Sequence, residues 1–312
     1  MNHKSFVFFD CECANTFEGI GKICSFGYVI ADDDLNIIES EDVVINPECE
    51  FDWYLFSGKG ECKLAYSKDY FRIKPNWESY HKNIKKLLTT GNRYIAGFAV
   101  GNDVGFVNNA CERYNQEYIQ FRAFDLERYL ERKYEKRQKL SEWAKEFGID
   151  ISSYQTHKSV DDAIITMLCL KAECEKIGKN VEQIMTEYKD CFVSNEQILE
   201  QAAEREYRRE IMEKIKRLYN KKSPMPRFKT VSQCRFEFDR KIFHDVDFAL
   251  ELVKKIYANG GIVSERITGH LPSGEKAFAV FKTIPDNAFV LKKLKDRGIE
   301  PMELGKLDNI LK

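Results

Sequence analysis

The sequence contains no long apolar run, no cysteines in C-x2-C spacing and no long-range internal repeat. A bilayer-spanning helix needs roughly 18 or more apolar residues, so no transmembrane segment is expected. The apolar run near the N-terminus is too short for the core of a signal peptide. The ten cysteines are scattered, which argues against a zinc module or a disulfide framework. We therefore expect a cytoplasmic protein with no membrane association.

The chain also lacks an excess of charge of one sign. Its 49 Lys and Arg and 50 Asp and Glu residues give a formal net charge of −1. This total neither indicates nor excludes a nucleic-acid partner, because local charge patches matter more than the sum. What the chain does have is 312 residues with 43% hydrophobic content. That is enough for a sizeable core in one large domain or two ordinary ones.

Short apolar runs alternate with amphipathic stretches over the first 178 residues. Clusters of β-branched and aromatic residues predict strands, and helical spacing ended by glycine predicts helices. A strand meander followed by alternating helices and strands indicates an α/β domain with a mixed five-stranded sheet flanked by helices. The predicted strands cover 5–9, 23–31, 37–46, 94–100 and 120–124, and the predicted helices cover 76–90, 103–118, 140–147 and 161–177.

The character of the sequence changes beyond Gly178. Residues 181–222 are highly charged with a helical period, and the segment from Ser223 to Pro226 (SPMP) breaks that helix. We predict three parts: an α/β domain over 1–178, a charged helical linker over 179–227 and a small α/β domain over 228–312. The basic end of the linker is either a solvated face or a surface that follows a nucleic-acid backbone.

The stretch FFDCEC near the N-terminus offers two kinds of metal ligand, the acids Asp10 and Glu12 and the thiols Cys11 and Cys13. Side chains alternate along a strand, so the two acids share one face and Cys11 points to the other. Adjacent carboxylates repel unless a cation lies between them, and oxygen ligands favour Mg²⁺ or Mn²⁺. Taken alone, the pattern more often marks a strand end that faces solvent.

Two later segments also carry acids where elements meet. Asp103 follows the apolar run YIAGFAV and lies at the start of a predicted helix, where an acid could simply favour the helix dipole. In HKSVDDA, His157 precedes Asp162 by five residues at the start of a long helix. The S-x-x-D spacing there is also that of a capping box, with an ordinary loop histidine before it.

The three segments together, in this order, resemble the motifs of the DEDDh 3′-to-5′ exonucleases. That family includes the proofreading subunit of the bacterial replicative polymerase, ribonuclease T and oligoribonuclease. Asp10 and Glu12 match its first motif, Asp103 its second, and His157 with Asp162 its third. The segment LSEWAKEFGID (140–150) is similar to the family's Leu-rich helix between the last two motifs. The resemblance covers roughly residues 5–178 and implies a ribonuclease H-like fold.

The resemblance also implies a chemistry. Two divalent ions, Mg²⁺ or Mn²⁺, would be held by Asp10, Glu12, Asp103 and Asp162, and His157 would be the general base. The reaction would release 5′ nucleoside monophosphates from the 3′ end of a nucleic acid. All five catalytic positions are present, which favours an active enzyme over a decayed one.

Two departures from the family pattern concern the substrate. Cys13 and Ala14 stand where the family often has two threonines, and Phe98 stands where its second motif commonly has histidine. The resemblance implies that these positions bind the 3′-terminal nucleotide. Cys11 and Cys13 are then expected to be bystanders to the metals.

Two regions lie outside the resemblance to the exonucleases. Residues 48–75 interleave aromatic and basic side chains, which either stack on unpaired bases or pack as a lid on the domain. The C-terminal domain is weakly similar to BRCT domains, which bind protein partners or DNA ends. We therefore expect a single-stranded DNA substrate first, with short RNA as the alternative and with repair or replication roles that depend on partners. A non-catalytic nucleic-acid-binding scaffold acting through its C-terminal domain is the other alternative.

Overall fold

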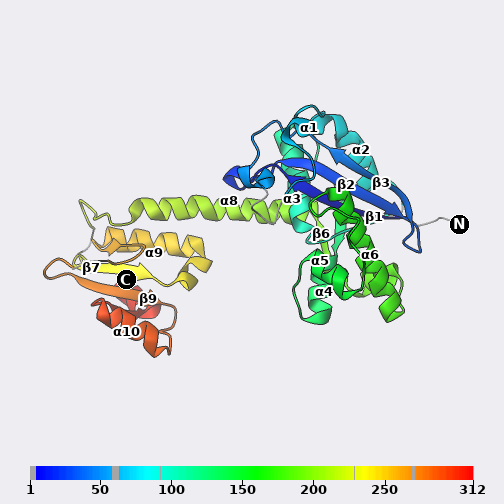
Figure 1. Cartoon of the computed structure of the whole chain (residues 1–312). Helices are drawn as coiled ribbons and strands as arrows, with labels where there is room; N and C mark the ends of the chain where they lie inside the picture. The colour runs from blue at the N-terminus through cyan, green and yellow to red at the C-terminus, as the bar shows by residue number, and fades with distance from the viewer. Residues whose placement is uncertain (1–4, 58–62, 92, 228, 269–270, 312) are drawn as a thin grey trace. The chain divides into compact units, whose positions relative to one another are not determined.

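A computed structural model of the chain describes residues 5–57, 63–91, 93–227, 229–268 and 271–311 (Figure 1). The chain divides into two compact units, Met1–Gln201 and Ala202–Lys312. Within the described residues, no helix is both long and apolar enough to cross a membrane.

The first unit contains a six-stranded sheet, counted over the described residues, with the order β3-β2-β1-β4-β5-β6. β1 pairs antiparallel with β2 and parallel with β4, and β5 runs parallel to β4. The predicted α/β class and mixed sheet are confirmed. The strands are β1 (Ser5–Cys13), β2 (Ile23–Ala31), β3 (Ile37–Val44), β4 (Arg93–Gly97), β5 (Arg122–Asp125) and β6 (Phe192–Ser194).

The structure adds a sixth strand, β6, to the five predicted, and this strand lies within the segment predicted as a charged helical linker over 179–227. β6 is only three residues long, and it pairs antiparallel with β5. A strand this short has too few residues to show the alternation of apolar and polar side chains by which strands are predicted from sequence. The residues just beyond the predicted domain end therefore contribute to the sheet.

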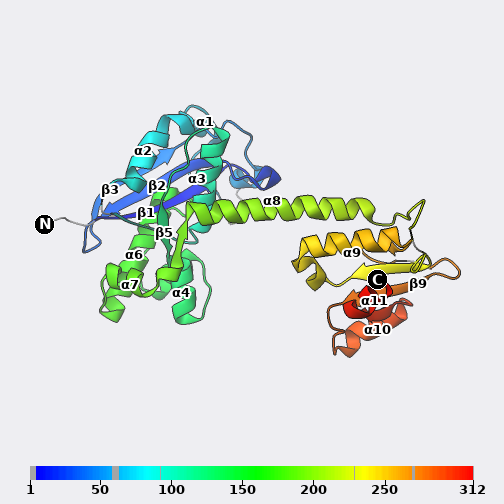
Figure 2. The same cartoon turned by 180° about the vertical axis from the view of Figure 1, so that it is seen from behind.

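Helices cover both faces of this sheet (Figures 1 and 2). One apolar core lies between the sheet and α2 and α3, and the other lies between the sheet and α4 to α7. The helices are α1 (Lys68–Arg72), α2 (Trp77–Thr89), α3 (Gly101–Arg113), α4 (Leu126–Tyr134), α5 (Leu140–Glu146), α6 (Ser159–Ile177), α7 (Val181–Glu187) and α8 (Asn195–Leu218), with short 3₁₀ turns η1 (Phe17–Gly19), η2 (Trp53–Phe56) and η3 (Lys189–Cys191).

Over its described residues, the second unit has a four-stranded sheet in the order β10-β9-β7-β8, and the strand pairings there are parallel. Its core includes Ile211 and Ile215 of α8 together with residues of α9. The strand β7 ends at Phe238, because Asp239 caps a 3₁₀ turn there by accepting the amide of Lys241. The elements are β7 (Cys234–Phe238), η4 (Arg240–His244), α9 (Val246–Ala258), β8 (Ile262–Val263), β9 (Lys276–Phe281), α10 (Ala288–Asp296), β10 (Glu300–Glu303) and α11 (Leu304–Ile310).

The start of α6 lies unusually close to β2, at Gly27. A Cβ atom on Gly27 would lie 2.0 Å from the backbone N of Val160 and 2.1 Å from the backbone C of Ser159. No side chain larger than hydrogen fits there without moving the helix. The absence of a side chain at this position therefore fixes how closely α6 approaches the sheet.

We expect Gly27→Ala to lower the free energy of unfolding by about 1–3 kcal/mol or more, because it overpacks this contact. Gly105→Ala in α3 is the matched control, since its Cβ would only touch Ile198 at 3.7 Å. Removing a mid-helix glycine should leave stability unchanged or raise it by up to about 1 kcal/mol. Urea denaturation of both variants checks this, and equal effects would contradict the proposed role of the close contact.

Candidate active site

The two acids of the first motif lie near the end of β1, in the middle of the sheet. They alternate with the apolar residues of the strand, so Asp10 and Glu12 lie on the face that Phe6 and Phe8 present to the core beneath α6. Cys11 is buried in the opposite core. The predicted separation of acids and thiol is therefore what the structure shows.

Asp103 joins this pair from a neighbouring element. It lies in the first turn of α3, just after β4, and is only 5% exposed. Its carboxylate accepts a hydrogen bond of 3.2 Å from the backbone N of Cys11, the residue between the two acids of β1. Because β4 runs parallel to β1, the two strands end at the same edge of the sheet, and the second motif meets the first there.

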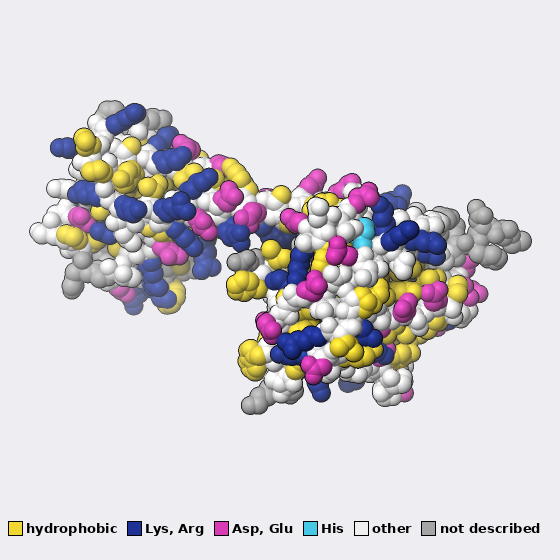
Figure 3. Space-filling model, turned by 90° about the horizontal axis from the view of Figure 1, so that it is seen from above, with side chains coloured by type: hydrophobic (Ala, Val, Ile, Leu, Met, Phe, Trp, Pro, Cys, Tyr) yellow, Lys and Arg dark blue, Asp and Glu magenta, His cyan; other side chains and the backbone are white. Residues whose placement is uncertain are grey.

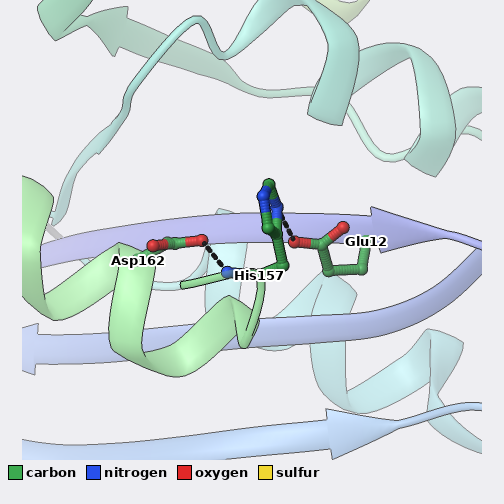
Figure 4. A group of neighbouring side chains, drawn as sticks. All are labelled: Glu12, His157 and Asp162. Carbon is green, nitrogen blue, oxygen red and sulfur yellow. Dashed lines mark hydrogen bonds and ion pairs between the residues drawn. The ribbon is translucent and has the colours of Figure 1, made fainter. Parts of the chain in front are cut away.

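The third motif closes the site from α6 (Figure 4). The backbone N of His157 donates to the carboxylate of Asp162 at 3.0 Å. The Nδ1 atom of His157 lies 3.4 Å from Oε1 of Glu12. One ligand atom from each of Glu12, His157 and Asp162 lies within 4.8 Å of the other two. Side chains from β1 and from the start of α6, far apart in sequence, thus form one group.

The backbone at His157 is itself unusual. Its φ of 60° lies in the left-handed region, which non-glycine residues seldom adopt. This turn directs the His157 amide back toward Asp162, five residues later. Strain of this kind is retained where the surrounding structure over-determines it, often at functional sites.

A buried polar chain anchors the start of α6 to the sheet. Ser159 Oγ donates to Ser25 Oγ at 2.8 Å, and Ser25 Oγ donates to Asp42 at 2.6 Å. The hydroxyl of Tyr66 donates to the other oxygen of Asp42 at 2.8 Å. These bonds satisfy buried polar groups that would otherwise destabilise the fold. They connect the helix that carries Asp162 to the aromatic loop over 48–75.

Asp161, the neighbour of Asp162, serves a different purpose. Its carboxylate accepts the backbone amide of Gln155 at 2.9 Å and contacts Nζ of Lys158 at 3.1 Å. It therefore points into the loop before α6, as its position on the helix predicts. Of the two adjacent acids, only Asp162 belongs to the site.

Three carboxyl groups of the site, those of Asp10, Asp103 and Asp162, have a raised pKa. Burial, then the charges of Asp103 and Glu12, raises the pKa of Asp10 well above its ordinary value. Burial likewise raises the pKa of Asp103 well above its ordinary value, although the amide of Cys11 opposes this. Burial and the charge of Glu12 raise the pKa of Asp162 to about 7. Buried carboxylates that repel one another are stabilised in their charged form by a bound cation.

This donor set fits a divalent metal. It consists of carboxylate oxygens with one imidazole, which suits hard cations such as Mg²⁺ and Mn²⁺. The thiols do not compete, because burial raises the pKa of Cys13 to about 12 and raises that of Cys11 well above its ordinary value. The described cysteines are all free thiols. The acids, and not the cysteines, are thus equipped to bind the metal.

In chelator, the raised pKa of Asp162 should make stability depend on pH. A folded-state pKa of about 7, above the ordinary value near 3.9, contributes stability that is fully present below about pH 4 and is lost as the pH rises through about 7. We expect the melting temperature of the metal-free wild type to fall over this interval relative to Asp162→Asn. Circular dichroism melts in EDTA measure this. Melting temperatures that change with pH in parallel for the two proteins would contradict this prediction. Added Mg²⁺ should remove the difference in pH dependence between them.

The group opens onto a cavity of about 510 Å³, a volume typical of small-ligand sites. Phe98, predicted as a substrate contact, lines it together with Asp10, Glu12, His157 and Asp162. The other lining residues were not predicted as substrate contacts, although three of them lie in the segment LSEWAKEFGID: Glu127, Arg137, Gln138, Lys139, Leu140, Ser141, Glu142, Thr156 and Ile165. The signal that could have found several of them is the basic run EKRQK over 135–139.

The other two predicted substrate contacts lie elsewhere. Ala14 is fully buried in a cluster with Phe51 and Leu55, and its carbonyl accepts the amide of Asp52. Cys13 is half-buried and is not among the residues that line the cavity. Contact of either residue with a nucleotide stays a prediction.

The aromatic loop over 48–75, of which residues 58–62 lie outside the described residues, packs in part on the domain, and stacking of its side chains on unpaired bases stays a prediction. Phe51 and Phe71 are buried in the cluster that contains Ala14. Trp53 is 72% exposed and Tyr54 is 42% exposed. The loop therefore packs on the domain and also presents aromatic surface to solvent.

The fold and site together define an α/β domain with an acidic, histidine-containing pocket at the end of its central strand. Residues 7–170, just over half of the sequence, match the family model RNase_T, described as exonuclease, and the chain therefore belongs to this exonuclease family. The predicted membership of an exonuclease family is confirmed. No curated protein shows a significant match to the chain.

Solved structures of low sequence identity resemble parts of the chain. A 3′-exonuclease from a study of histone mRNA stem-loop recognition is 14% identical, with a TM-score of 0.46, over 57% of this chain and 64% of its own. Exonuclease I of E. coli in complex with a dA16 oligonucleotide is 17% identical, with a TM-score of 0.47, over 59% of this chain and 42% of its own. The nuclease domain of 3′hExo, a DEDDh family member bound to rAMP, is 16% identical, with a TM-score of 0.46, over 57% and 93%. The chain thus spans less than two thirds of the first two proteins.

Proposed function

We propose that the protein is a metal-dependent 3′-to-5′ exonuclease that hydrolyses phosphodiester bonds at the 3′ end of a nucleic acid. The observation that carries this proposal is the convergence at one sheet edge of Asp10, Glu12, Asp103, His157 and Asp162. These residues come from β1, α3 and the start of α6. Two of the carboxylates are so buried that they repel one another strongly without a cation.

Asp10, Glu12, Asp103 and Asp162 would hold the divalent ions, Mg²⁺ or Mn²⁺ and two in number. Bound ions would supply charge stabilisation for the attacking and leaving oxygens of the phosphodiester. The protein holds these carboxylates in place through the Cys11 amide on Asp103 and the His157 amide on Asp162. Burial excludes water around Asp103, which strengthens its interaction with a cation.

His157 is the proposed general base. Its ordinary pKa lies near working pH, so the neutral ring can take a proton from the attacking water. Nδ1 of the ring lies 3.4 Å from Oε1 of Glu12, so this carboxylate can orient the imidazole. The carboxylate of Glu12 then stabilises the imidazolium that forms. The ring is 33% exposed, so a proton can pass from it to solvent after each turnover.

The proposed substrate is the 3′ end of a single strand, with DNA ahead of short RNA. The cavity of about 510 Å³ suits one terminal nucleotide better than a duplex. Phe98 offers an aromatic surface in the same cavity, on which a base could stack. The products would be 5′ nucleoside monophosphates. The preference for DNA rests on the resemblance of the C-terminal domain to BRCT domains, which stays a prediction.

The test is degradation of oligonucleotides of DNA and RNA labelled at the 5′ end, with Mg²⁺ or Mn²⁺. We expect a ladder that shortens from the 3′ end, is lost in chelator and appears first with single-stranded DNA. The same oligonucleotide blocked by a 3′ phosphate or labelled at the 3′ end distinguishes the direction of attack.

The result that would overturn the proposal is a folded protein that binds the oligonucleotides yet cleaves none of them with either metal. It would favour a non-catalytic nucleic-acid-binding scaffold. Cleavage at internal positions would keep the hydrolase chemistry but reject the exonuclease direction.

A further inference from the structure

The two units carry opposite net charges, which the near-neutral total conceals. Residues 1–201 contain 25 Lys and Arg against 34 Asp and Glu, a formal charge of −9. Residues 202–312 contain 24 Lys and Arg against 16 Asp and Glu, a formal charge of +8. Setting aside Asp10, Glu12, Asp103 and Asp162 still leaves the first unit negative. The net charge of the unit with the catalytic cavity therefore opposes the approach of a polyanion, whereas the net charge of the second unit favours it.

Lys and Arg side chains gather over the second unit on the face drawn in Figure 3. Within this unit lies a cavity of about 840 Å³. The cavity lies at the carboxyl end of β7, where Glu237 and Phe238 line it. Arg266, which follows β8, lines it as well. In open parallel sheets, ligands commonly bind in the crevice outside the carboxyl ends of the strands.

The charged side chains of this cavity differ in what they are bonded to. Arg297 is held by Glu237 through bonds of 3.2 and 2.7 Å and by the carbonyl of Ile267 at 2.6 Å, so it is a structural residue. Arg240 and Arg266 are exposed, and within the described part of the chain neither has an ion pair or side-chain hydrogen bond. Two guanidinium groups are thus available to an anion.

Other lining residues narrow down the kind of anion. The cavity also contains the aromatic rings of Tyr219, Phe238 and Phe243, all half-buried. Phe238 and Phe243 lie with ring centroids 6.0 Å apart. Glu265 is the opposing acid in the lining, next to Arg266. Guanidinium groups beside aromatic faces are the combination that binds the backbone and bases of a single-stranded nucleic acid.

We propose that this cavity binds single-stranded nucleic acid, with Arg240 and Arg266 on backbone phosphates. The choice of a nucleic acid over an acidic protein segment as the ligand rests on the proposed function. If the first unit cleaves a nucleic-acid strand, a site on the second unit that holds the same strand serves that reaction. A second binding site on the same chain raises the local concentration of the strand at the first. The acidic catalytic unit would thus capture its substrate through the basic unit.

The experiment measures the dissociation constant of the full chain for a fluorescent 20-nucleotide DNA strand in EDTA, over a series of salt concentrations. Arg240→Glu/Arg266→Glu is compared with Lys292→Glu/Lys306→Glu, which makes the same charge change at exposed sites on α10 and α11 of the same unit. We expect the arginine pair to weaken binding about tenfold or more and to lower the salt slope by about one to two. Unchanged melting temperatures show that both proteins are folded.

Hydrolysis of a chromogenic phosphodiester of thymidine 5′-monophosphate separates the two proposals, because this small substrate needs only the catalytic cavity. We expect equal rates for wild type and both double variants. If the wild type fails to hydrolyse it, the proposed function fails while the binding result stands. Equal weakening by the two pairs, or none by the arginine pair, would overturn the inference. The inference would also be overturned if the arginine double variant lost binding to a polyglutamate peptide but kept its binding to the DNA strand. That result would assign the cavity to acidic proteins.

Discussion

Asp10→Asn should lower kcat by about 10³-fold or more while leaving a folded protein that is more stable than wild type in chelator. The loss is large because bound metal supplies several kcal/mol of transition-state stabilisation, and each 1.36 kcal/mol is about a factor of ten in rate. The gain in stability has the opposite origin. Burial and the charges of Asp103 and Glu12 raise the pKa of Asp10, so a neutral amide removes a repulsion that only a cation would otherwise relieve.

Steady-state cleavage of a labelled oligonucleotide and melting curves with and without Mg²⁺ measure the two effects together. Asp33→Asn is the matched control, since Asp33 is an exposed acid in the turn between β2 and β3. It should change neither quantity. If Asp10→Asn kept its activity, or if it lowered stability in chelator, the assignment of Asp10 as a metal ligand would be wrong.

His157→Asn should lower kcat by about 10²–10⁴-fold, the usual contribution of a general base. Asparagine is chosen because it tolerates the left-handed conformation at φ 60° and keeps the backbone amide that donates to Asp162. The carboxylates stay in place, so Mg²⁺ should still raise the melting temperature. The variant should also lose the acid limb of the pH–rate profile, where wild-type activity falls as the ring becomes protonated.

His244→Asn, at an exposed histidine of the second unit, is the control and should keep the wild-type profile. An unchanged acid limb in His157→Asn would show that another group takes the proton. Loss of the Mg²⁺ effect on melting would instead make His157 part of the metal site, which its 3.4 Å approach to Glu12 also permits.

The acids and the histidine were predictable because each lies at a boundary that local sequence encodes. Asp10 lies near the end of an apolar strand, Asp103 follows another, and Asp162 lies in the first turn of a helix of 19 residues. These patterns predict the ends of elements that meet at a sheet edge, and the family resemblance supplies their order. The separation of Cys11 from the acids followed from strand alternation alone.

What the sequence could not predict depends on contacts between distant segments. The close approach of Gly27 to Val160 and the bonds from Ser159 through Ser25 to Asp42 exist only after the sheet has formed. The same holds for Ala14, whose burial depends on the loop that folds over it. Small residues after the first motif suggested a substrate pocket, but local sequence does not distinguish a pocket wall from a core position.

The short strand β6 has a practical consequence for how the protein can be divided. A polypeptide ending at residue 178 would leave β5 as an open edge, with unpaired amides and carbonyls ready to join another chain. It would also lose Val193 and Ile198 from the first core and the Asn195 carbonyl that accepts from Asn108. Such a fragment should aggregate when expressed, whereas one extended through residue 201 keeps the edge closed.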